Sequence, residues 1–169
     1  CGVGTRLSKD KTKAFAGKTG FPSLSVEHKL YIHPTINVLE DADLRYGPLE
    51  KYANLSVSGV LTGAYPVTAG NIKAREIRGA DITAIGDVES QVGITDAVIV
   101  AQGDIRARYL HNCRIETFGN VYIENEMIDC EIYCSGKIDS GNCHIISTTL
   151  YGKKGVEIAG AGSGKTNAC

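Results

Sequence analysis

The sequence predicts an all-β fold, a single-stranded β-solenoid with 16 or 17 residues in each turn. Three observations support it: glycine recurs at a nearly constant spacing, a β-branched residue follows each of these glycines at a fixed offset, and apolar residues alternate with polar ones in between. Side chains of a strand alternate between its two faces, so this pattern lines the inside of a coil with apolar residues. A single turn has no core, and neighbouring turns must stack to create one.

The glycine series is clear from residue 66 onward. Its members are separated by alternating intervals of 16 and 17 residues: Gly70, Gly86, Gly103, Gly119 and Gly136. Gly152 is a candidate for the next position in the series. Four of them are followed by Asn or Asp. We expect this pair to form a corner with positive φ, which Gly, Asn and Asp tolerate.

Apolar columns are expected to fill the interior, because each copy of the repeat offers the same inward positions. One column follows the glycines, and two more lie between them: Ile72, Val88, Ile105, Val121 and Ile138; Ile77, Ile94, Leu110 and Met127; Ile82, Ile99, Ile115 and Ile132.

The first 50 residues have a different pattern. Short alternating runs, LSVEH and KLYIH, are interrupted by Pro22 and Pro34, which indicates a hairpin or small β-subdomain. A turn-rich connector follows. We therefore divide the chain into a small β-subdomain with its connector, 1–50, and a β-helix, 51–169, whose core repeat covers 66–158 and whose first turn contains LSVSGVLTGA.

Composition restricts the function classes. The net charge is −1 and the sequence has no Lys/Arg-rich block, so nucleic acid is not an expected partner. No apolar run approaches the roughly 18 residues of a membrane span, and no signal peptide is visible. We expect no membrane insertion. The chain begins at Cys1, which favours an excised fragment over the alternative of a processed lipoprotein.

Cysteines and histidines near the end of the repeat suggest a metal site at first sight: Cys113, Cys130, Cys134 and Cys143, with His111 and His144. The repeat register favours another interpretation, since three of these cysteines take positions that Ala or Thr occupies in earlier turns. Free Cys behaves there as a small hydrophobe in a reducing cytoplasm. Cys143 with His144 stays open, although two adjacent ligands fall short of a tetrahedral site.

Two further motifs suggest chemistry and are better explained by structure. AGAGSGKT, residues 159–166, resembles a phosphate-binding loop, but Ala159 replaces the first glycine and we expect no helix after Thr166. The stacked positions Asn71, Asp87, Asp104 and Asn120 would bring two carboxylates to about 5 Å, close enough for shared-proton or cation chemistry. Corner formation already explains them. We therefore assign no catalytic, cofactor-binding or metal residue, and we expect no cofactor.

The succession of repeat phrases resembles one family. VTAGNIKAREIRGADITAIGDVESQVGI, VIVAQGDIRARYLHNCRIETFGNVYIENEMIDCEIYCSGKI and LYGKKGVEIAGAG are similar to the β-helix region of the flagellar assembly protein A family, and more distantly to the C-terminal domain of the cell-division inhibitor MinC. The resemblance covers roughly residues 1–165. It implies a right-handed β-helix in a bacterial cytoplasmic protein tied to flagellar assembly and to the cell pole. It carries no catalytic motif.

Two functions from different classes follow. The first is a non-catalytic scaffold or interaction domain that acts through protein partners and through self-association into a homo-oligomer, since a solenoid offers long faces and strand edges. The alternative is a β-helix enzyme, acyltransferase-like or lyase-like, with its site on one outer face. The outward positions are chemically mixed (Lys73, Glu89, Arg106, Tyr122 and Asp139), which favours the scaffold.

Overall fold

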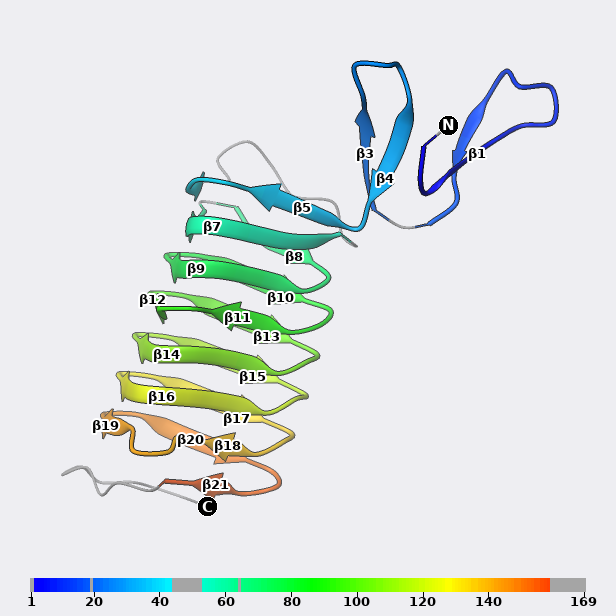
Figure 1. The fold of residues 1–169 in the computed structure, drawn as a ribbon. Helices are drawn as coiled ribbons and strands as arrows, with labels where there is room; N and C mark the ends of the chain where they lie inside the picture. Colours follow the sequence, from blue (N-terminus) through cyan, green and yellow to red (C-terminus); the bar gives the residue numbers. More distant parts are fainter. Residues whose placement is uncertain (1, 19, 44–52, 64, 159–169) are drawn as a thin grey trace.

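The computed structural model describes residues 2–18, 20–43, 53–63 and 65–158, and every regular element in these ranges is a β-strand (Figure 1). A solenoid of about seven turns begins at residue 35 and is preceded by two small antiparallel sheets. The predicted all-β solenoid is confirmed, together with the small β-subdomain before it. The described residues contain no helix long and apolar enough to cross a membrane.

Two parallel sheets form the walls of the solenoid. The six-stranded sheet contains β8 (Val67–Ala69), β10 (Asp81–Ala84), β13 (Val98–Ala101), β15 (Arg114–Thr117), β17 (Glu131–Cys134) and β20 (Thr149–Gly152). The second sheet contains β5 (Thr35–Val38), β6 (Ala42–Asp43), β7 (Asn54–Thr62), β9 (Ile72–Arg78), β11 (Val88–Ser90), β12 (Gly93–Thr95), β14 (Ile105–His111), β16 (Val121–Ile128), β18 (Ile138–Asp139), β19 (His144–Ile146) and β21 (Val156–Glu157). From β7 to β20, each turn thus contributes one rung to each sheet.

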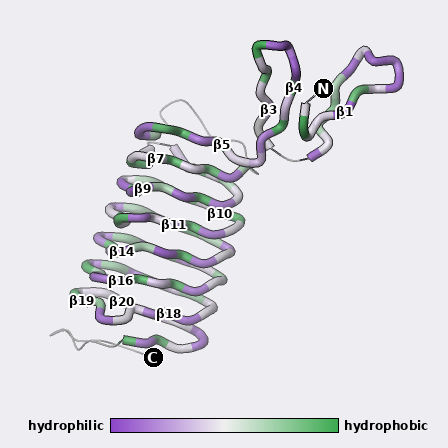
Figure 2. Tube along the Cα trace, in the orientation of Figure 1, coloured by the Kyte–Doolittle hydropathy of each residue, from purple (hydrophilic) through white to green (hydrophobic). Residues whose placement is uncertain are grey.

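The interior is filled as the repeat predicts. Ile82, Ile99 and Ile115 are ladder partners on β10, β13 and β15, and all three are fully buried. The other two columns, which contain Ile72 and Ile77, are buried to the same degree. Each fully buried aliphatic side chain contributes about 1.5–3 kcal/mol from the transfer of its surface out of water. Figure 2 shows the resulting alternation of hydrophobic and hydrophilic residues along the turns.

The glycine corners do not have the predicted backbone conformation. Positive φ occurs instead at the corner that leads into the six-stranded sheet, at Gly79, Asp96, Asn112, Asp129 and Ser147. Gly103 and Gly119 are required for a different reason, because a Cβ on either would overlap the backbone of the turn beneath. Close approach between turns, and not left-handed geometry, accounts for this glycine series. The expectation of positive φ there was wrong.

The solenoid also differs from the predicted repeat at both of its ends. The backbone N–H of Lys154 donates to the carbonyl of Gly136, whereas Gly152 pairs with Cys134, so Gly152 does not continue the glycine column. At the other end, β5 pairs in parallel register with β7, and β6 pairs with its second half. The ladder therefore extends to Thr35, ahead of the boundary drawn at residue 51.

The alternation between 16 and 17 residues arises at one corner. Two residues separate the inward side chains of Ala74 and Ile77, but three separate Ser90 from Ile94. The register between neighbouring turns shifts at this place, between Ala107 and Tyr109 for example. The other corners keep a constant length from Ile77 onward. The extra residue is therefore accommodated outside the stacked columns.

The N-terminal sheets are two hairpins. β1 (Thr5–Leu7) pairs with β2 (Ala14–Ala16), and β3 (Phe21–Leu24) pairs with β4 (Leu30–His33). They are joined by backbone hydrogen bonds, from the N–H of Gly2 to the carbonyl of Leu30 and from the N–H of Ile32 to the carbonyl of Val3. Both hairpins project away from the first turn of the solenoid (Figure 1).

Candidate interaction surface

The four cysteines between residues 113 and 143 are free thiols buried in the wall of the solenoid. Cys113 and Cys130 lie on neighbouring turns, in the column of Ala80 and Ala97, as the register predicted. A hydrogen bond with Cys130, together with burial, raises the pKa of Cys113. The same hydrogen bond lowers the pKa of Cys130. Cys113 stays protonated at neutral pH, and the thiolate is the form that binds metals or attacks substrates.

Cys143 and His144 do not converge. Cys143 is buried, and burial raises the pKa of its thiol to about 11, whereas His144 is exposed on the outer surface. Within the described ranges, no group of three or more His, Cys, Asp or Glu side chains is placed to hold a metal ion. The segment that resembles a phosphate-binding loop, 159–166, lies outside the described residues.

The stacked Asn and Asp side chains form a hydrogen-bonded ladder between turns. The Oδ1 atom of Asp87 accepts from the backbone N–H of Asp104 at 2.8 Å, and Oδ1 of Asp104 accepts from the N–H of Asn120 at 2.9 Å. The ladder begins at Asn54 and ends at the N–H of Lys137. These side chains therefore satisfy backbone donors at a corner, which leaves the carboxylates in a structural role.

The second sheet presents a polar outer surface whose charges are engaged with one another. A hollow of about 720 Å³ lies over β11, β14 and β16. At its edge the guanidinium of Arg106 lies 4.6 Å from the ring centroid of Tyr122 and bonds Asp104 at 3.0 Å. Arg108 pairs with Glu124 at 3.5 Å. Pairing of this kind leaves little uncompensated charge to orient a substrate.

His111 takes part in one further polar pair. Its Nε2 atom lies 2.7 Å from Oε1 of Glu126, and its ring packs 4.9 Å from that of Tyr109. The pair is about one-third exposed. Nucleophilic catalysis of the Ser–His or Cys–His type needs a positioned Ser or Cys next to such a base, and neither Glu126 nor Tyr109 is one. His111 thus lies on the outer surface of the solenoid, away from the buried cysteines.

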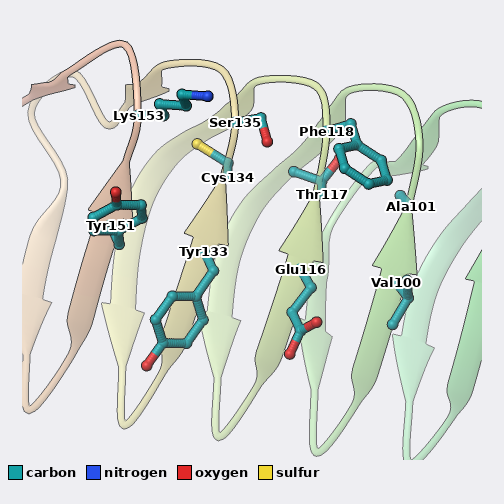
Figure 3. A pocket seen from close by; sticks show the side chains of 10 residues that line it. All are labelled: Val100, Ala101, Glu116, Thr117, Phe118, Tyr133, Cys134, Ser135, Tyr151 and Lys153. Atoms are coloured by element: carbon teal, nitrogen blue, oxygen red, sulfur yellow. The ribbon is translucent and has the colours of Figure 1, made fainter.

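The six-stranded sheet has a contrasting, largely apolar outer face. A hollow of about 310 Å³ crosses four of its rungs (Figure 3). Aromatic, aliphatic and a few polar side chains line it: Val100, Ala101, Glu116, Thr117, Phe118, Tyr133, Cys134, Ser135, Tyr151 and Lys153. Phe118 is 73% exposed, and the rings of Tyr133 and Tyr151 lie 6.4 Å apart on neighbouring rungs. We name this outer face of β13, β15, β17 and β20 the aromatic face.

Charged residues cross the middle of the aromatic face. On β15, Arg114 bonds Glu116 at 3.0 Å on its own strand and Glu131 at 3.4 Å on the next rung. The carboxylate of Glu116 raises the pKa of Arg114. Val98 and Val100 lie on the rung before this pair, and Tyr133 lies on the rung after it. The face thus has a charged centre with an apolar pad on each side.

The repeat analysis did not single out this face. Its residues occupy the outward positions of the alternation, where the sequence varies from turn to turn, and the inward pattern carries no information about them. The signal that would have found them is an aromatic or branched residue at an outward position, as Val98, Val100, Tyr133 and Tyr151 are. Large exposed apolar groups gathered on one face mark interaction sites.

Comparison with known proteins assigns the fold to a family. Residues 34–168 match the family model described as the Flagellar Assembly Protein A beta solenoid domain. The chain belongs to the flagellar assembly protein A family. The match begins one residue before β5, so the family domain and the parallel ladder start together. The family is linked to flagellar assembly by its name, which specifies no reaction. The chain matches no curated protein and no solved structure at a significant level.

Proposed function

We propose that this domain is a non-catalytic scaffold in flagellar assembly and that it binds protein partners, including a second copy of itself, through the aromatic face. The observation that carries the proposal is the exposed apolar surface around the hollow, with Phe118, Tyr133 and Tyr151 at its edge. Aromatic side chains are enriched at the buried centres of protein interfaces. Following the family resemblance, we place the protein in the bacterial cytoplasm, at the cell pole.

A second copy of the chain is complementary to this face. If the two solenoid axes run in the same direction with the faces opposed, β15 of one copy lies antiparallel over β15 of the other. Arg114 then faces Glu116 of the second copy, and Val98 faces Val100. Two sheets packed face to face lie about 10 Å apart, and their apolar side chains are buried between them. Charge complementarity thus supports self-association as part of the scaffold role.

The absence of a catalytic role is also part of the proposal. Its support is that the charges on the polar surface pair with one another and that Cys113 and Cys143 have raised pKa values. An enzyme of this architecture would need a cluster of uncompensated groups directed at a common point.

The test is site-specific photo-crosslinking in flagellated bacteria that express the protein. A photo-reactive phenylalanine analogue at position 133 is expected to give covalent products with flagellar assembly components and with the protein itself. The same analogue at Tyr122, on the polar surface, is the matched control and is expected to give few. Arg114→Glu should lower self-crosslinking, and Arg114→Glu combined with Glu116→Arg should restore it.

Equal yields from positions 133 and 122 would contradict the assignment of the aromatic face. Loss of self-crosslinking in both the single and the double charge variant would contradict the proposed orientation of the two copies.

A further inference from the structure

The first hairpin concentrates positive charge. Residues 2–18 contain five basic side chains and one acidic side chain, Asp10, in a chain whose net charge is −1: Arg6, Lys9, Lys11, Lys13 and Lys18. All five are exposed, and three of them lie in or beside the turn between β1 and β2. The rest of the chain therefore carries an excess of acidic residues. The lysines alternate with other residues, so no continuous basic block marks them in the sequence.

The single carboxylate in this hairpin is used to build the turn. Asp10 accepts hydrogen bonds from the hydroxyl of Ser8 and, at 2.7 Å, from that of Thr12. These bonds lower the pKa of Asp10 to about 2. The turn is closed by the N–H of Lys11, which donates to the carbonyl of Ser8 at 3.0 Å. This small turn holds Lys9, Lys11 and Lys13 close to one another at one end of the molecule.

Exposed apolar side chains accompany these cations. Leu7 and Phe15 are 49% and 47% exposed on β1 and β2, and Leu24 is 66% exposed at the end of β3. Val26, in the turn between β3 and β4, is 97% exposed. In Figure 2 the outer end of the first hairpin is hydrophilic, whereas the tip of the second contains a hydrophobic segment. Nothing in the described parts of the chain buries these side chains.

We propose that the two hairpins dock on the surface of an anionic phospholipid bilayer. Lysine and arginine side chains are attracted to anionic lipid headgroups, and exposed aromatic and aliphatic side chains enter the boundary between headgroups and acyl chains. Lys9, Lys11 and Lys13 supply the first interaction, and Leu24 and Val26 supply the second. The contact is peripheral, since no part of either hairpin crosses the bilayer.

The apolar residues favour a lipid surface over a nucleic acid. Contacts to phosphate backbones use cations and hydrogen-bond donors, and exposed aliphatic tips such as Leu24 and Val26 add nothing to them. At a bilayer the same residues gain favourable burial. The proposal concerns the end of the molecule opposite β21 and is independent of the aromatic face.

The test is cosedimentation of the chain with vesicles of phosphatidylcholine, with and without phosphatidylglycerol. We expect binding only to the anionic vesicles and a decrease in binding as salt is raised. The variant Lys9→Gln, Lys11→Gln, Lys13→Gln should lower the partition coefficient about 100-fold. A matched variant on the solenoid, Lys73→Gln, Arg75→Gln, Lys154→Gln, should bind as the unmodified chain does. Val26→Ser should weaken binding several-fold without a change in charge.

Two outcomes overturn the proposal. One is equal loss of vesicle binding in the hairpin and solenoid triple variants, which would show a response to overall charge. The other is tight, lysine-dependent binding to duplex DNA or RNA with no cosedimentation, which would assign the hairpins to nucleic acid. Circular dichroism and the urea unfolding midpoint verify that each variant is folded.

Discussion

The solenoid and the hairpins before it are both built of short strands, but they are stabilised in different ways. In the middle of the solenoid each inward side chain rests on its equivalents in the turns on either side, and the central isoleucines are fully buried. In the hairpins, Ile32 is the one buried apolar residue among those described, and Leu7, Phe15, Leu24 and Val26 are exposed. Isolated two-stranded hairpins are marginally stable in water. Stacking between turns, and not strand pairing alone, therefore stabilises the fold.

The largest predicted effect comes from removing an inward side chain in the middle of the stack. Ile99→Ala should lower the free energy of unfolding by about 3 kcal/mol, because the lost side chain leaves a cavity between two rigid turns. Leu24→Ala in the hairpin should change it by less than about 0.5 kcal/mol, since Leu24 is already exposed. Urea unfolding followed by circular dichroism measures both. Similar losses for the two variants would remove the distinction between the regions.

A smaller effect should distinguish the two kinds of solenoid corner. Gly119→Ala should cost about 2 kcal/mol, because its Cβ would overlap backbone atoms of Gly103 and Asp104 that cannot move independently. Gly79→Ala should cost about 1 kcal/mol, since φ is +57° there but no atom lies within 4 Å of the new Cβ.

Gly79→Asn is the matched control for the corner variants. Asn112 already adopts positive φ at the equivalent corner, so this variant should be milder than Gly79→Ala. The same urea titration ranks all three variants. A larger cost for Gly79→Asn than for Gly119→Ala would contradict the assignment of close approach to the glycine column.

The smallest expected effect is that of removing the hairpins altogether. A chain that begins at Pro34 keeps the carbonyl that accepts from the N–H of Asn54 and keeps all of β5. Its unfolding free energy should lie within about 0.5 kcal/mol of that of the longer chain, as expected for independent regions. Thermal and urea unfolding of the two chains compare them directly. A markedly lower stability would identify the hairpins as a cap on the first turn.

The interior of the solenoid could be predicted from the sequence because one physical requirement recurs in every turn. Ile77, Ile94 and Leu110 are interchangeable solutions to the same packing position, and the period of the chain follows from them. Cys113 and Cys130 were placed correctly by the same register, as small residues in an alanine column.

Other features depend on contacts that a linear pattern does not encode. Positive φ at Asp96 and close approach at Gly119 both favour small or flexible residues, so composition alone could not distinguish the two corners. The start at Thr35 was missed because residues 44–52, whose sequence does not follow the repeat, separate β5 and β6 from the regular copies. The aromatic face lies at outward positions, where turns do not resemble one another.

The corner of variable length has a consequence for engineering. Between the same two buried columns, the chain contains two residues after Ala74, three after Ser90 and four after Ser140, and the ladders on either side continue. The molecule thus already contains a graded series of insertions at one edge. A peptide epitope or a fluorescent tag grafted between Gln91 and Val92 should be displayed on that edge. The turn chosen for the graft sets its position along the solenoid axis. A second graft at Asn125 would place another marker on the same edge, at a known separation from the first.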